Sequence, residues 1–81
     1  MEEDVLHRIA VDPRVMLGKP VVRGTRITVE ILLEKIAAGC TVDEVLGDYP
    51  TLRREDVLAA VAYAREALGT DEIIPRLKIP E

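Results

Sequence analysis

The sequence predicts a mainly α-helical fold: a short N-terminal β-hairpin followed by a three-helix bundle with a helix-turn-helix, of the homeodomain-like or winged-helix-like kind. Residues 9–27 contain short apolar runs separated by turn residues, which is typical of a hairpin. Residues 28–68 repeat apolar side chains at helical spacing, between residues suited to helix caps. A chain of 81 residues forms one domain, residues 1–81, with a modest core. Because so small a core gains stability from oligomerisation, we expect a homodimer.

A hairpin and a cationic loop are predicted for residues 9–27. The apolar runs are residues 9–11, 15–17 and 21–22, and an Asp-Pro pair or a glycine lies beyond each of them. A lone hairpin is only marginally stable in water. We therefore expect this one to pack on the helices or to pair across a dimer.

The first two helices are predicted from their caps. Thr28 is a suitable N-cap residue for the first, whose apolar residues form a single stripe, and Gly39 ends it. Thr41 and Glu44 have the spacing of a capping box at the start of the second, and Pro50 lies beyond its end.

The third helix is the longest, from about Arg53 to Leu68, with Gly69 as its stop. Its alanines make it slim, so another helix can approach closely. The residues expected to face the core share helical spacing: Val57, Leu58, Val61 and Leu68.

Residues 69–81 are predicted to form an extended tail, because two prolines interrupt any regular helix there. The tail is nevertheless apolar, through Ile73, Ile74, Leu77 and Ile79. Such a segment either folds back on the domain or docks on a partner. We expect these four residues to bind a partner protein or the second subunit.

Composition excludes several kinds of site. One cysteine and one histidine allow neither an intrachain disulfide nor a Cys/His zinc site within one chain. The chain has no serine for a nucleophile, and we expect no catalytic residues, metal or cofactor. No apolar run is long enough to span a membrane, and no secretory leader is evident. A cytoplasmic protein is expected.

The charge is unevenly distributed. The net charge of −4 argues against a globally basic nucleic-acid binder, but residues 8–26 hold five cations and one acid. Arg53 and Arg54 stand at the start of the last helix, from which a helix-turn-helix reads the major groove. We expect both to contact DNA; alternatively, they are solvated and pair with Glu55 or Asp56.

Three loop cations, Lys19, Arg23 and Arg26, are expected to support DNA binding by gripping the phosphate backbone. The alternative is that they form ion pairs with a partner chain or with Glu30 and Glu34. Their spacing does not match the phosphate-binding P-loop.

The motifs resemble a known family. The order I-x-x-D-P-x-V-x-x-G-K-P-x-x-x-G-T-R-I-x-V, then D-Y-P-x-L, then E-D-x-x-A-A-x-x-Y-A is similar to the bacterial and archaeal domain of unknown function 433, over residues 9–64. The resemblance implies a small dimeric helix-turn-helix protein with an N-terminal β element. It also implies an antitoxin similar to VapB, encoded beside a PIN-like ribonuclease toxin.

One position departs from that family. Members usually carry Ser or Thr before the Glu-Asp pair, where it caps the last helix, whereas this chain has Arg53 and Arg54. We expect the cap to shift to Thr51, or the helix start to be weakened by about 0.5–2 kcal/mol.

The resulting functional expectation is an antitoxin-like, DNA-binding regulator of a type II toxin–antitoxin pair. It would neutralise a PIN-like ribonuclease by direct binding and repress its own promoter. The alternatives are a protein-interaction module that does not bind DNA and a stand-alone transcriptional regulator.

Overall fold

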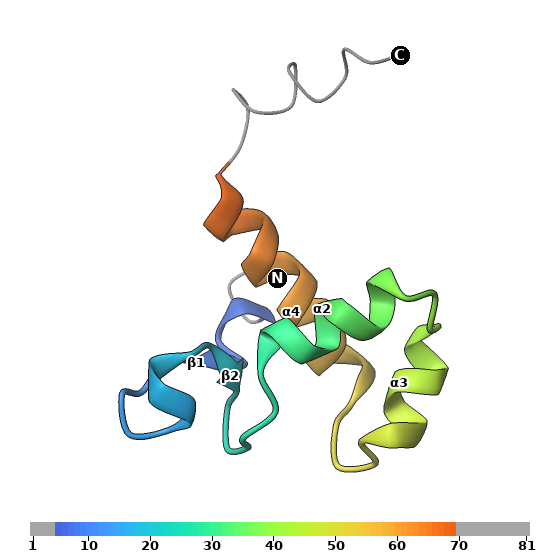
Figure 1. Ribbon diagram of the computed structural model, residues 1–81, viewed down its shortest axis with the longest axis horizontal. Helices are drawn as coiled ribbons and strands as arrows, with labels where there is room; N and C mark the ends of the chain where they lie inside the picture. Colours follow the sequence, from blue (N-terminus) through green and yellow to red (C-terminus); the bar gives the residue numbers. More distant parts are fainter. Residues whose placement is uncertain (1–4, 70–81) are drawn as a thin grey trace.

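The computed structural model describes residues 5–69, and within them a hairpin is followed by three helices (Figure 1). The predicted mainly helical class is therefore confirmed. The hairpin lies at one side of the domain, α3 at the other, and α2 between them. In chain order the elements are β1 (Ile9–Ala10), β2 (Val21–Val22), α2 (Val29–Ala37), α3 (Val42–Asp48) and α4 (Arg54–Leu68).

The hairpin forms within one chain. β1 and β2 are antiparallel, with Ile9 opposite Val22 and Ala10 opposite Val21, and an isolated bridge joins Val21 to Thr28. β1 also contacts α4, so the hairpin packs on the helices, one of the two arrangements expected of it.

The apolar run at residues 15–17 does not form a strand. Met16–Gly18 is a short 3-10 turn, in which Met16 and Leu17 have φ values of 49° and 59°. The turn follows a local hydrogen bond from the amide of Val15 to the carbonyl of Asp12, at 2.8 Å. This bond bends the chain before a strand can begin.

The caps of α2 and α3 are the predicted ones. Thr28 Oγ1 accepts a hydrogen bond from the amide of Ile31 at 3.0 Å. At the start of α3, the amide of Glu44 donates to Thr41 Oγ1 at 3.1 Å and the amide of Thr41 donates to Glu44 Oε1 at 2.8 Å. Each bond satisfies a backbone donor that the helix leaves free.

The first half of α4 supplies the centre of the core. Val57, Ala59 and Ala60 are buried on it, and α2, α3 and β1 all contact the helix. The two alanines leave room for close approach, as the sequence predicted. The buried core consists of small and branched aliphatic residues: Ile9, Val22, Val29, Leu32, Val45, Leu52, Val57, Ala59 and Ala60.

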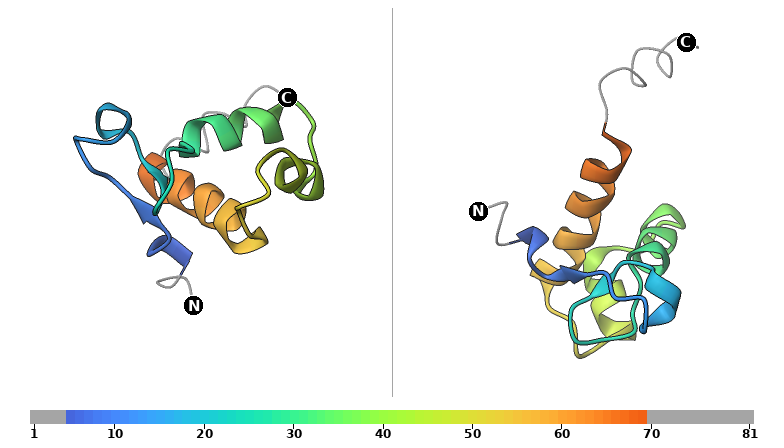
Figure 2. Two further views of the ribbon diagram at one scale, coloured as in Figure 1. Left: turned by 90° about the horizontal axis from the view of Figure 1, so that it is seen from below. Right: turned by 90° about the vertical axis from the view of Figure 1, so that its left-hand side faces the viewer.

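The predicted apolar stripe of the last helix is wrong except at Val57, because its other three members are exposed: Leu58, Val61 and Leu68. The helix turns its alanines inward instead. Its C-terminal half projects beyond the rest of the domain (Figures 1 and 2), so Leu68 lies beyond the reach of the core.

The start of α4 is capped by an acid rather than by Thr51. Arg53 is the N-cap residue, and a guanidinium cannot accept a hydrogen bond. Asp56 compensates, because its Oδ2 accepts from the amide of Arg53 at 2.8 Å. Its Oδ1 accepts from Arg8 Nη1 at 3.0 Å, which ties the N-terminal segment to the helix. No helix among residues 5–69 is long and apolar enough to cross a membrane.

Candidate macromolecular interface

The predicted DNA contacts lie at the start of α4, which residues 49–53 connect to α3. Both Arg53 and Arg54 are exposed there. Arg54 Nη2 lies 2.8 Å from Asp43 Oδ1 of α3, so its charge is paired across the turn. The sequence correctly allowed for pairing with an acid, but expected Glu55 or Asp56. The side chain of Arg53 has no ion pair among the described residues.

Lys19 forms an ion pair with Glu30, which the sequence analysis gave as the alternative to DNA binding. Its Nζ lies 3.1 Å from Oε1 of Glu30, in the first turn of α2. Both side chains are exposed, so the pair contributes little stability. It does reduce the positive charge that Lys19 presents to solvent.

Arg23 is engaged by the backbone of the hairpin. Its Nε donates to the carbonyl of His7 at 2.9 Å and its Nη2 to that of Ile9 at 3.3 Å. The amide of Arg23 donates to the carbonyl of Arg8, which therefore points toward β2. Arg23 is thus held against the segment that leads into β1 and against β1 itself.

Arg26 is exposed and forms neither an ion pair nor a side-chain hydrogen bond within residues 5–69. With Arg23 and Arg53, it is one of three predicted DNA contacts that have no carboxylate partner in the part of the chain described.

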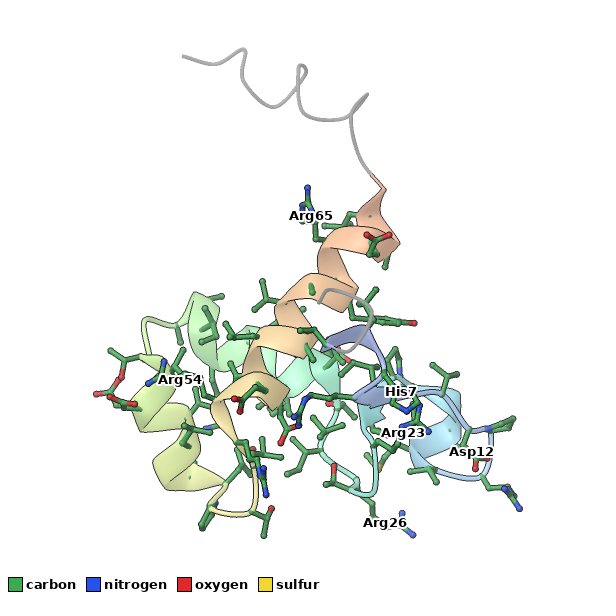
Figure 3. The ribbon with its side chains drawn as sticks, turned by 180° about the vertical axis from the view of Figure 1, so that it is seen from behind. His7, Asp12, Arg23, Arg26, Arg54 and Arg65 are labelled. Carbon is green, nitrogen blue, oxygen red and sulfur yellow. The ribbon has the colours of Figure 1, made fainter. Side chains whose placement is uncertain are left out.

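The five predicted cations do not form one patch. Figure 3 shows Arg54 beside α3, whereas Arg23 and Arg26 lie at the hairpin on the opposite side of the domain. A single straight phosphate backbone would have to span the domain to meet all of them. The structure therefore divides the predicted site into two separate, weakly basic regions.

Two ion pairs at the surface each shift the pKa of at least one of their members. Hydrogen bonds from the side chain and amide of Arg14 hold the pKa of the Asp12 carboxyl below its ordinary value. In α2, the hydrogen bond to Asp48 raises the pKa of Lys35, which also lies 5.7 Å from the ring centre of Tyr49. Neither group is buried, so these shifts describe local pairing at the surface.

An exposed apolar face of α4 was missed by the sequence reasoning. Leu58, Val61 and Leu68 are 48%, 44% and 72% exposed, and Arg65 completes their spacing along one side of the helix. We call these four residues the outer face of α4. The alanines could have revealed this face. The buried ones lie on another side of α4 than its larger apolar residues, and small side chains suit the side that packs closely against neighbouring elements.

Two further points concern metal ligands and the predicted tail. No group of three or more His, Cys, Asp or Glu side chains suited to a metal ion occurs in residues 5–69. The predicted partner-binding residues of the tail lie outside the described residues: Ile73, Ile74, Leu77 and Ile79.

Three helices and a hairpin form a small helical domain that carries two separate exposed basic regions within residues 5–69. Comparison with known proteins gives its family. The chain belongs to the family described as Protein of unknown function (DUF433), which matches residues 9–64.

Two proteins are similar to this chain. The chain is 32% identical to a DUF433 member protein from Anabaena variabilis ATCC 29413 of known crystal structure, with a TM-score of 0.72, covering 91% of this chain and 70% of that one. It is also 40% identical over 52 residues to the uncharacterized protein y4eO of Sinorhizobium fredii. That match covers 64% of this chain and 24% of y4eO, so this chain spans about a quarter of that relative.

Proposed function

We propose that this chain is an antitoxin-like binding protein of a type II toxin–antitoxin pair. It neutralises a PIN-like ribonuclease in the cytoplasm by direct contact and catalyses no reaction itself. The family resemblance suggests the class of partner. The physical argument for a protein partner comes from the outer face of α4.

The outer face of α4 is the observation that carries this proposal. Exposed single hydrophobic residues are ordinary on protein surfaces. Leu58, Val61 and Leu68 instead share one side of a helix, and the aliphatic stem of Arg65 can extend the same apolar strip. An amphipathic helix with its apolar side exposed is a common element of protein recognition.

Co-expression with the product of the adjacent gene tests the proposal. The expected result is a stable complex that co-purifies with the full chain and lacks ribonuclease activity. The double variant Leu58→Glu/Val61→Glu should disrupt it, because two charges would be buried without partners at the interface. Both side chains are exposed, so the domain should stay folded, which circular dichroism checks.

Ala67→Glu is the matched control. It adds the same kind of charge to α4, and Ala67 is exposed on the side of the helix axis opposite Leu58. This variant should keep the complex. An adjacent gene product that never co-purifies, or equal losses in both variants, would contradict the proposal. A light-scattering mass of twice 9.0 kDa for the chain alone, which Leu58→Glu/Val61→Glu reduces to 9.0 kDa, would assign the face to the expected homodimer instead.

Promoter repression is the second candidate function, with or without a toxin. The specific observation in its favour is the helix-turn-helix order of α3 and α4, with Arg53 at the N-cap of α4. Arg53 is exposed and has no ion pair within residues 5–69. Arg54 would join it only by leaving Asp43.

Asp43→Asn tests this second candidate. The substitution frees Arg54, so affinity for the chain's own promoter should rise if the start of α4 contacts DNA. Asp48→Asn is the control, since it makes the same change in charge beside Lys35. Binding should also weaken with added salt, because phosphate contacts release counterions. If both variants change the affinity for the promoter equally, the start of α4 has no specific role in DNA binding.

A further inference from the structure

The hairpin end of the domain contains a surface cavity of about 530 Å³. This volume is within the range of about 300–1,000 Å³ typical of ligand clefts. Its apolar wall includes Ala10, Val15 and Val21, and its lining also contains Arg23 and Arg26 from the segment after β2. Figure 3 shows both arginines at the hairpin end of the domain. The cavity is on the opposite side of the domain from Arg54 and α3.

The cavity carries a net positive charge. Its one acidic lining residue, Asp12, is bound by Arg14 at 3.1 Å through Nε and at 3.0 Å through Nη2. Arg23 uses two of its five N–H donors on the hairpin backbone, which leaves three. Arg26 makes no side-chain hydrogen bond within residues 5–69. Two guanidiniums with free donors are therefore available to an anionic group.

Three exposed apolar residues, which we call the apolar rim, neighbour lining residues in the sequence: Val11 lies between Ala10 and Asp12, and Met16 and Leu17 follow Val15. Val11, Met16 and Leu17 are 57%, 38% and 93% exposed. Met16 and Leu17 also have positive φ values, a conformation that is unfavourable for residues with a side chain. Neither burial nor backbone preference accounts for a leucine at position 17. Strained residues of this kind concentrate at ligand-binding sites.

We propose that this cavity binds an extended acidic peptide segment of a partner protein, with carboxylates on Arg23 and Arg26 and aliphatic side chains on Val11, Met16 and Leu17. The site is separate from the outer face of α4, and it does not depend on the partner being a ribonuclease. Guanidinium forks match carboxylates geometrically, and methionine and arginine are enriched in protein interfaces.

A peptide fits these observations better than a nucleic acid. Phosphate backbones are recognised by rows of cations and polar groups, whereas here two cations line a cavity that also has an apolar wall. A peptide with alternating acidic and aliphatic residues satisfies both parts of the surface. A nucleic acid would leave the apolar rim in contact with water.

Amide NMR spectra of the full, ¹⁵N-labelled chain test the inference. The probes are a short synthetic peptide of alternating Leu and Glu, its counterpart with Gln for Glu, and a short mixed-sequence DNA duplex. The Leu-Glu peptide should shift the amide signals of residues 10–26. The Gln peptide should bind at least about tenfold more weakly, because it lacks the carboxylates.

Arg26→Glu should lower the affinity for the Leu-Glu peptide by about tenfold or more. Leu17→Asn should also lower this affinity, but without changing how the affinity depends on salt. Ala67→Glu is the control, because it puts the same glutamate at an exposed position of α4 that is not part of the outer face, and it should leave binding unchanged. The inference is overturned if the Leu-Glu peptide causes no shifts at residues 10–26, if Ala67→Glu weakens binding as much as Arg26→Glu, or if only the DNA duplex binds there. Co-purification of the adjacent gene product is independent of each of these outcomes.

Discussion

The carboxylate of Asp56 joins two distant parts of the chain. One oxygen accepts from the amide of Arg53 at the start of α4, and the other accepts from the guanidinium of Arg8, which precedes β1. The Asp56 side chain is 11% exposed and that of Arg8 is 36% exposed. A nearly buried carboxylate needs such partners, and here they also fix where the helix begins.

Asp56→Ala should lower the free energy of unfolding by about 1–3 kcal/mol, because it removes a cap and leaves the amide of Arg53 without its partner. Chemical denaturation measures this loss. Glu55→Ala, at the exposed neighbouring position, should change stability by less than about 0.5 kcal/mol. Equal effects of the two substitutions would show that Asp56 has no special role.

The pair of Asp12 and Arg14 predicts how the stability of the fold changes at acid pH. Since Arg14 lowers its pKa in the folded chain, Asp12 stabilises the fold above its unfolded pKa, and this contribution disappears as the pH falls through the folded value, below 3.8. In an NMR titration of the carboxyl carbon, Arg14→Gln should move the midpoint up toward 3.8. An unchanged midpoint would mean that the pair does not persist in solution.

At the scale of elements, α4 has two different faces. The side with Val57, Ala59 and Ala60 is buried, and the outer face holds larger apolar residues in contact with water. The first side decides how closely the neighbouring elements approach. The second adds nothing to the core, and we relate it to partner binding.

Ala60→Leu tests the close packing of α4. Ala60 has no exposed surface, so added methyl and methylene groups should force its neighbours apart and lower stability by about 1–3 kcal/mol. Thermal denaturation measures the effect. Ala67→Leu makes the same change at an exposed position of the helix and should have little effect. Tolerance of leucine at position 60 would contradict the burial described.

Elements with local signals could be predicted from the sequence, and those set by distant contacts could not. Thr28 and the pair Thr41 and Glu44 act on amides within three residues, so the starts of α2 and α3 were correct. The buried side of α4 depends on what packs against it, and alanine gives a weak apolar signal.

The candidate site also divides into features with local signals and features set by distant contacts. The sequence identified the cations but not their partners, because the bond from Arg54 to Asp43 joins two helices. The bonds from Arg23 to β1 depend equally on the folded hairpin. The cavity beside Arg26 also required the tertiary structure, since its wall comes from both strands and the loops around them.

At the scale of the whole molecule, the distribution of charge favours a protein partner. The chain has a net charge of −4, and five ion pairs within residues 5–69 engage more than half of the lysines and arginines there. Such pairs are individually weak. A nucleic acid must nevertheless displace a carboxylate from each paired cation, whereas the outer face of α4 has no intramolecular competitor among the described elements that bury the core.

The central claim is that apolar contact through α4, rather than its arginines, holds the partner. Calorimetric titration of the adjacent gene's product into the full chain tests this most directly, using Leu58→Glu/Val61→Glu and Arg53→Glu/Arg54→Glu. We predict that the first variant loses at least about two orders of magnitude in affinity and that the second binds nearly as tightly as the original chain. Loss of binding in the arginine variant, with the apolar variant unaffected, would contradict the claim.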